Sequence, residues 1–345
     1  MTSLSASRFR IGTVGFGLIA AAVCAAALFF AIADIGFGQI RDEVFAVGFG
    51  LVGIIAVHIG QLAFCALGWQ QLFVGPARRH WPFGPLLTLR WVRESIDHLL
   101  PVAQIGGEVI GARLLAGRGT TLPIAGASVI ADLTIETLTQ AIFTLIGLAL
   151  LLVLADPGDV LRWAVIGFGV AMFFAGLAVF GQRWGGVRMF ERLLLMIAER
   201  LGWNRLEGIA GLDRTLSQVY TLRGRLLIAG FHHMVAWSLG TGEVLIAAWA
   251  LGYDINVGQA FVIESLAQAV RSAAFFVPGA VGVQEGGFVV VAGVFGIPAD
   301  VAISMSLTKR IRELVLGIPG LAAWQWHELK RRRFREKLEI SPGTV

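Results

Sequence analysis

Charged residues stand inside apolar segments of this chain, and their spacing fits helices. The stretch RWVRESIDHLLP contains Arg90, Arg93, Glu94, Asp97 and His98. Arg90 and Glu94 are four positions apart, as are Arg93 and Asp97, so each pair can meet on one helix face. A charge at bilayer depth costs about 2.5 kcal/mol or more, so such groups are expected to face one another or water.

The same residue types recur in other apolar segments that could position a site. They are Glu108, Asp132, Glu136, Glu264, Arg271, Glu285, Lys309, Arg310, Arg312 and Glu313. Lys309 and Glu313 can form a further pair at helical spacing, whereas Arg271 has no obvious partner on its own segment. We therefore expect Arg271 to bind an anionic group, either a substrate phosphate or a distant glutamate.

Two interpretations of these charges remain open. In one, they are structural ion pairs that lock helices together. In the other, Arg93, Arg271, Lys309, Arg310 and Arg312 line a groove and hold an anionic substrate group, while the acids balance charge or couple protons. The acidic set is Glu94, Asp97, Glu108, Asp132, Glu136, Glu264, Glu285 and Glu313. Glu108 and Glu285 have a third interpretation, as N-terminal caps of the helices that follow them.

Catalytic and cofactor motifs are absent from the sequence. It contains no HExxH, G-x-S-x-G, P-loop or CxxC, and no group of His and Asp residues with metal-ligand spacing. Cys24 and Cys65 lie in apolar runs and are expected to be buried thiols, and His58, His232 and His233 are interpreted as packing or interfacial residues. The sequence thus predicts no catalytic residue, no cofactor and no metal.

The composition is that of an integral membrane protein. Hydrophobic residues make up 56% of the 345 residues and charged residues 15%, and the mean hydropathy is +0.75. These values exclude an ordinary soluble domain. A membrane span needs about 20 apolar residues. We predict full spans near residues 11–33, 44–73, 121–154, 161–181, 224–251 and 299–327.

The formal net charge of +5 is explained by membrane topology. Basic residues gather at alternate connections and in the tail KRRRFREK, whereas the intervening connections, such as DPGD and GYDIN, carry mostly acids. By the positive-inside rule this pattern predicts that both termini are cytoplasmic. No segment resembles a nucleic-acid-binding module, so nucleic acid is not an expected partner.

Two segments, 83–118 and 257–297, are apolar but interrupted. The first is split near Pro101 and the second near Pro278 and Gly279, which Gly282 and Gly286 follow. Halves of roughly 15–20 residues barely cross a core of about 30 Å. Each segment is therefore a re-entrant helical hairpin or a pair of short spans, and both choices give the same topology.

The two interruptions belong to an internal repeat. PVAQIGGE begins at residue 101 and PGAVGVQE at residue 278, and the offset of 177 also relates Glu108 to Glu285 and Glu136 to Glu313. An odd number of crossings in the first half would invert the second half. The sequence predicts an all-α polytopic membrane protein of two inverted halves, 1–155 and 156–345, with about six full spans and two interrupted hairpins. The second half adds an amphipathic segment, 187–220, and a basic tail, 328–345.

The stretch VPGAVGVQEGGFVVVAGVFGIPADVAISMSLTKRIRELVLGIPGLAAWQ, residues 277–325, resembles the lysylphosphatidylglycerol synthase transmembrane region, a flippase-like membrane family. The form LTKRIRELVLGIPGLAAWQ is similar to the subgroup associated with hopanoid biosynthesis. The resemblance implies a multi-pass protein of the bacterial inner membrane that handles lipids. Two-domain members also carry a cytoplasmic domain that transfers lysine to phosphatidylglycerol. The sequence shows no such domain, so lysine transfer is not carried over.

Three functions follow from the residues and the resemblance together. The first is a lipid transporter or flippase for a hopanoid-linked or anionic polar lipid, without a nucleotide site. The second is an intramembrane lipid-modifying enzyme that uses the same carboxylates as acid and base. The third is a non-catalytic scaffold, with lipid-biosynthesis enzymes as partners. The repeat favours transport, and the oligomeric state is left open.

Overall fold

The computed structural model describes residues 45–75, 77, 81–100, 106–116, 118–154, 211–274, 280 and 282–340, with side chains described up to residue 329. These residues form helices and connections, and no strand occurs among them. The helices are α3 (Gly50–Gln70), α5 (Phe83–Leu99), α6 (Gly106–Ala116), α7 (Leu122–Leu154), α10 (Leu212–Thr221), α11 (Arg223–Ala250), α12 (Val257–Ala273), α13 (Val283–Gly293) and α14 (Ala299–Ile340). The prediction of an all-helical chain is confirmed for this part of the protein.

Four helices occupy positions predicted for full spans. They are α3, α7, α11 and α14, of which α3 and α7 are long and apolar enough to cross a membrane by composition alone. α14 continues to Ile340, so the predicted tail from residue 328 extends the last helix. The predicted spans 11–33 and 161–181, and the amphipathic segment up to residue 210, lie outside the described residues. The number of spans stays a prediction.

The two interrupted segments form helical hairpins of equal dimensions. α5 and α12 each have 17 residues, and α6 and α13 each have 11. At 1.5 Å per residue, these arms are about 26 Å and 16 Å long, so the second arm covers about half of a bilayer core. The bounds of α6 and α13 differ by the same 177 residues that relate the two sequence motifs, as do the first residues of α7 and α14. Pro101, Pro278 and Gly279 lie outside the described residues.

Local sequence explains where the hairpin arms begin. Asn256 accepts the backbone N–H of Gln259 at 2.9 Å, and the Gln259 side chain accepts the N–H of Asn256 at 3.0 Å, which caps α12. α13 follows Gly282, whose φ of +76° favours glycine. Glu285 accepts the N–H of Gly282 at 2.8 Å, so the interpretation of Glu285 as a cap is confirmed.

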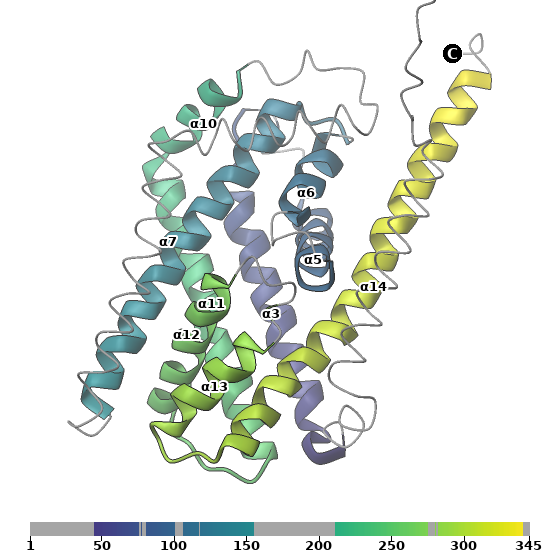
Figure 1. Ribbon diagram of the computed structural model, residues 1–345. Helices are drawn as coiled ribbons and strands as arrows, with labels where there is room; N and C mark the ends of the chain where they lie inside the picture. The colour runs from purple at the N-terminus through teal and green to yellow at the C-terminus, as the bar shows by residue number, and fades with distance from the viewer. Residues whose placement is uncertain are drawn as a thin grey trace, which may run out of the picture.

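Helices α7 and α14 run in opposite directions in Figure 1. α7 descends from the top of the view to the lower left, whereas α14 rises from the bottom to the upper right. The hairpin of α5 and α6 lies in the upper part of the view and that of α12 and α13 in the lower part. α3 packs along α11 between them, and α14 packs against both α5 and α13.

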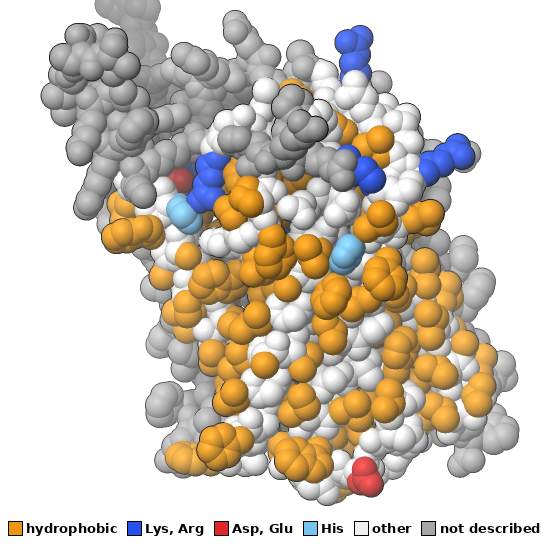
Figure 2. All heavy atoms as spheres, turned by 180° about the vertical axis from the view of Figure 1, so that it is seen from behind, with side chains coloured by type: hydrophobic (Ala, Val, Ile, Leu, Met, Phe, Trp, Pro, Cys, Tyr) orange, Lys and Arg blue, Asp and Glu red, His pale blue; other side chains and the backbone are white. Residues whose placement is uncertain are grey.

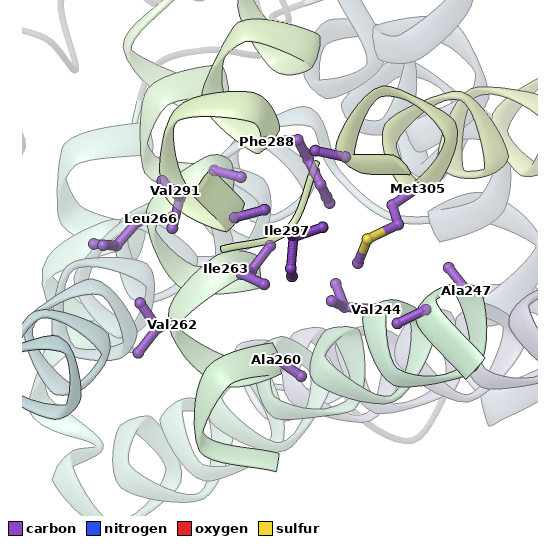
Figure 3. Packing of buried hydrophobic residues seen from close by; sticks show 14 of the residues in the cluster. Val244, Ala247, Ala260, Val262, Ile263, Leu266, Phe288, Val291, Ile297 and Met305 are labelled. Atoms are coloured by element: carbon purple, nitrogen blue, oxygen red, sulfur yellow. The ribbon is translucent and has the colours of Figure 1, made fainter. Parts of the chain in front are cut away.

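Small and aliphatic residues fill the space between the helices. In Figure 3 the side chains of Val244, Ile263, Phe288, Ile297 and Met305 converge from α11, α12, α13 and α14 and the connection before α14. On α10, Leu212, Leu216 and Val219 are buried and pack toward α7, as expected for the apolar stripe of an amphipathic helix.

The outer face is apolar, as a surface in contact with lipid must be. Phe49, Val153 and Trp249 are 96%, 80% and 77% exposed. Figure 2 shows apolar side chains spread over one face, with basic side chains near its upper edge and an acidic one at its lower edge. Polar side chains, by contrast, are concentrated in the interior.

Candidate functional site

The first ion cluster joins the first hairpin to α7 and α11. It consists of Arg90 and Arg93 on α5, Glu108 on α6, Asp132 and Glu136 on α7, and His233 on α11. The two terminal nitrogens of Arg90 donate to the two carboxylate oxygens of Glu136, at 2.6 and 2.9 Å. This bidentate arrangement fixes the orientation of α5 against α7.

Asp132 is the centre of the first ion cluster. Its Oδ2 accepts Arg93 at 2.9 Å and Arg90 at 3.3 Å, and its Oδ1 accepts His233 at 3.0 Å. Arg93 also donates to Glu108 and lies 4.4 Å from the centre of the Trp69 ring. Asp132 and His233 are both fully buried, and Arg93 is 1% exposed. A carboxylate in this position is held by three donors from two neighbouring helices.

The second ion cluster joins the second hairpin to α11 and α14. Its members are Glu243 on α11, Glu264 and Arg271 on α12, Glu285 on α13, and Lys309, Arg310, Arg312 and Glu313 on α14. Arg271 donates to Glu313 at 2.5 Å, and Lys309 donates to Glu264 at 2.5 Å. Each hairpin therefore binds the long helix that follows it through charged side chains.

Glu243 is the most enclosed acid of the second ion cluster. It is fully buried and accepts Arg312 at 2.6 and 2.7 Å and Gln61 at 2.6 Å. The Nζ atom of Lys309 lies 3.5 Å from Oε2 of the same carboxylate. Such a carboxylate is stable in an apolar interior only because several donors share it.

His58 on α3 links helix α5 of the first hairpin to the second ion cluster. Its Nε2 lies 2.5 Å from Glu94 on α5, and its Nδ1 lies 3.0 Å from Glu243 on α11. Arg312 also approaches Nδ1, at 2.5 Å. His98, one turn after Glu94, lies 3.7 Å from the same carboxylate. A polar path thus runs from the first hairpin through α3 to α14.

The ion pairs predicted within α5 are not the ones that form. Arg90 pairs with Glu136 and Asp132 on α7, and Arg93 pairs with Glu108 and Asp132. The partners expected at four-residue spacing have other roles. Glu94 binds His58, and Asp97 accepts the N–H of Gly107 at 2.8 Å, which caps α6. These side chains of α5 lie between α3, α6 and α7, and these helices supply their partners. A charge that is buried against a neighbouring helix is stable only if that helix provides a group of opposite charge.

The predicted pair of Lys309 and Glu313 is also replaced. Lys309 reaches Glu264, and Glu313 binds Arg271, Arg310 and Arg312. Of the two partners expected for Arg271, the structure provides the distant glutamate. Gly282 and Gly286 lie at the start of α13, beside its capping acid.

The sequence interpretation missed three members of these clusters. Glu243 stands alone in the apolar segment SLGTGEVLIAAW, and a single acid in such a segment is itself a signal of an internal partner. His58 and His233 were interpreted as packing residues. Both are buried, but each binds at least one carboxylate.

Acids outnumber bases in the two clusters and their link taken together, although not among the buried residues. The two clusters and their link contain the bases Arg90, Arg93, Arg271, Lys309, Arg310 and Arg312, and the acids Glu94, Asp97, Glu108, Asp132, Glu136, Glu243, Glu264, Glu285 and Glu313. Nine acids face six bases, an excess of three. His58, His98 and His233 also contact these groups, and Cys65 lies beside Glu136 and His233. Four of the nine acids, Glu94, Asp97, Glu136 and Glu285, are only half-buried, so the excess lies at the edges of the clusters.

One group of side chains in the first cluster has the composition of a metal site. Cys65, Glu136 and His233 place one ligand atom each within 4.8 Å of one another. Arg90, however, occupies both carboxylate oxygens of Glu136. A divalent cation would stand beside this guanidinium, so we assign Glu136 and His233 to the ion cluster and not to a metal site.

A small cavity lies beside the His58 link. It is lined by His58, Leu62, Trp91, Glu94, Ser95, His98, Glu313, Leu316 and Gly317. Its volume of about 10 Å³ is close to what a single water molecule requires. This cavity is therefore too small for a group much larger than one water molecule.

Comparison with known proteins gives one match. The family model described as the lysylphosphatidylglycerol synthase TM region matches residues 17–320. No curated protein and no solved structure matches the chain. The matched range covers both hairpins, both ion clusters and the His58 link.

Proposed function

Because this chain belongs to the lysylphosphatidylglycerol synthase transmembrane family, whose members have a lipid-related function in the membrane, we propose that it moves a polar lipid between the leaflets of the bilayer. The observation that carries the proposal is the pair of buried ion clusters, one on each hairpin. A transporter needs charged groups at membrane depth that are stable without substrate and can exchange partners when substrate arrives.

The proposed architecture is an inverted repeat. It is supported by the equal lengths of the hairpin arms, by the offset of 177 residues between the second arms, α6 and α13, and by the opposite directions of α7 and α14 in Figure 1. The short second arms, α6 and α13, favour re-entrant hairpins over full spans. In such folds the substrate site lies between the repeats near the midplane.

Each ion cluster contains one acid that is accessible from its edge. In the first cluster the Glu136 side chain is 19% exposed, against 0% for Asp132 and 7% for Glu108. In the second the Glu285 side chain is 20% exposed, against 3% for Glu313. We propose that the anionic part of a headgroup first replaces Glu285 on Arg310, or Glu136 on Arg90, while the apolar part stays in lipid.

The cargo and setting follow the same proposal. A hopanoid-linked or anionic polar lipid suits a groove whose walls carry arginines, which bind phosphate or carboxylate oxygens through several donors. We place the protein in a bacterial inner membrane with both termini in the cytoplasm, because basic connections alternate with acidic ones. Its chemistry is binding and exchange, without a cofactor of its own.

The test is leaflet exchange in liposomes that contain the purified protein. A headgroup-labelled anionic lipid in the inner leaflet is followed by reduction from outside. Arg310→Gln is expected to lower the exchange rate by about 10- to 100-fold, because a hydrogen bond to a charged group contributes about 1.5–3 kcal/mol. Arg214→Gln is the matched control, since Arg214 is exposed on α10 and lies outside both clusters.

Two outcomes would contradict parts of this proposal. Equal rates for wild type, Arg310→Gln and Arg214→Gln at equal protein content would remove the second ion cluster from the mechanism. A labelled lipid that returns with a changed mass would instead favour the lipid-modifying enzyme. Mass spectrometry of the extracted lipid distinguishes these cases in the same sample.

A further inference from the structure

The environment of His58 contains a conflict that a proton can resolve. Its Nδ1 faces an acceptor, the Glu243 carboxylate at 3.0 Å, and a donor, the Arg312 guanidinium at 2.5 Å. A protonated Nδ1 can donate only to Glu243. A bare Nδ1 can accept only from Arg312. The protonation state of one ring nitrogen therefore decides which of two opposite charges is its partner.

The other ring nitrogen connects this choice to the first hairpin. Nε2 lies 2.5 Å from Glu94, which accepts its proton in both states of the ring. When Nδ1 is also protonated, the imidazolium ties α5 to α11 through two carboxylates. When Nδ1 is bare, His58 ties α5 to Arg312 on α14 instead. One proton thus exchanges the helix to which the first hairpin is bound.

We propose that His58 is a proton-binding site that couples the first hairpin to the second ion cluster. The charged and titratable groups that face it come from each neighbouring helix: Glu94 and His98 from α5, Glu243 from α11, and Lys309, Arg312 and Glu313 from α14. The cavity beside the ring has room for about one water molecule, through which a proton can reach His58.

The role of the proton in lipid movement rests on the proposed function, but proton binding does not. Protonation strengthens the contact between His58 and Glu243 and displaces Arg312 from the ring. Arg312 stays near Glu313, 3.5 Å away, which also holds Arg271 of the second hairpin. Proton binding at α3 is in this way transmitted to the second hairpin through α14.

Histidine NMR measures proton binding directly and requires no transport. The protein, which has six histidines, is labelled in its imidazole rings and placed in lipid nanodiscs. His58→Gln identifies the His58 signals, and it retains one donor and one acceptor, so the fold can persist. We expect the His58 ring to pass from neutral to doubly protonated as the pH is lowered across the range in which the protein stays folded.

Glu94→Gln provides a second variant with a predicted direction. Its loss of negative charge beside Nε2 disfavours the imidazolium, so the His58 transition should move to lower pH. His232→Gln is the matched control, because His232 bonds to the backbone oxygen of Ile228 and lies outside the link. A His58 ring that keeps one protonation state over the whole range, or a transition that Glu94→Gln leaves in place, would overturn the proton site.

A second experiment measures whether proton binding at His58 changes the rate of lipid exchange. In liposomes with a pH gradient, wild type and His232→Gln should exchange lipid at a rate that changes by up to about tenfold per pH unit, as expected for a step that needs one proton. His58→Gln should lose this response. An unchanged pH profile in His58→Gln would overturn coupling through His58. If wild type moves no lipid but His58 titrates as expected, the proposed function fails and the proton site stands.

Discussion

Asp132→Asn should be among the most destabilising single acid-to-amide substitutions in the described interior. Asp132 is fully buried and accepts three donors, His233 at 3.0 Å, Arg93 at 2.9 Å and Arg90 at 3.3 Å. Asparagine keeps the size but removes the charge, and its NH₂ group would face a donor. Breaking a buried charge pair costs about 3–5 kcal/mol, because the remaining charges stay buried.

Glu285→Gln is the matched comparison, because it also replaces a carboxylate by an amide, but at a side chain that is less buried than Asp132. The Glu285 side chain is 20% exposed, accepts the Gly282 N–H at 2.8 Å and lies 3.2 Å from Arg310. Glutamine can still accept from Gly282, and water can reach the position. We expect a loss of about 0.5–1.5 kcal/mol, the net contribution of one hydrogen bond.

The assay is reversible unfolding in mixed micelles by increasing denaturing detergent, followed by tryptophan fluorescence and far-UV circular dichroism. The free energies of unfolding of wild type and the two variants are compared under one condition. Losses that agree within about 0.5 kcal/mol, the usual effect of surface substitutions, would refute the reasoning. In that case the buried network would not determine stability, and Asp132 would be compensated from elsewhere.

Two further predictions concern the hairpins and their orientation. A Cβ at Gly107 would overlap the backbone oxygen of Arg93 and the carboxylate of Asp97, so Gly107→Ala should cost about 1–3 kcal/mol in the same unfolding assay. A Cβ at Gly286 would meet no neighbouring side chain or other helix within 4 Å, so Gly286→Ala should be neutral or stabilising. Equal effects of the two substitutions would contradict the packing of α5 on α6. In a background without Cys24 and Cys65, single cysteines at the exposed positions 254 and 300 should react with an impermeant maleimide only from outside the cell, and those at 84 and 121 only after the inner side is opened. Labelling of all four from one side would contradict the inverted repeat.

Sequence patterns located the hairpin arms well because the relevant constraint is local. Apolar periodicity and a break define where α6 and α13 begin, and the same offset relates Glu108 to Glu285 in the sequence and α6 to α13 in the fold. Glu285 caps α13 as the sequence suggests, whereas the cap of α6 is Asp97 and Glu108 pairs with Arg93. The membrane also restricts the possibilities, since an acid within an apolar helix needs an internal partner. The members of the interior were therefore largely predictable.

The partners of those residues were not predictable in the same way. Spacing within one helix suggested that Arg93 pairs with Asp97, but Arg93 reaches Asp132 and Glu108, 39 and 15 positions away. Which side chain faces which depends on the crossing of α5, α6 and α7, and no pattern within a single segment contains that geometry. Glu243 was overlooked because it has no charged neighbour in its own segment, although its isolation was the signal.

Several acids of the second ion cluster have more than one basic partner, so they would stay paired if a hairpin moved. Glu313 contacts Arg271, Arg310 and Arg312, and Glu243 contacts Lys309 and Arg312. If the second hairpin moves and Arg271 leaves Glu313, this carboxylate still has donors on its own helix. An exchange of partners costs less than the isolation of a buried charge, which would require several kcal/mol. In the proposed mechanism, a proton on His58 or an anionic headgroup on Arg310 would act through this sharing, because a carboxylate that loses one donor keeps another.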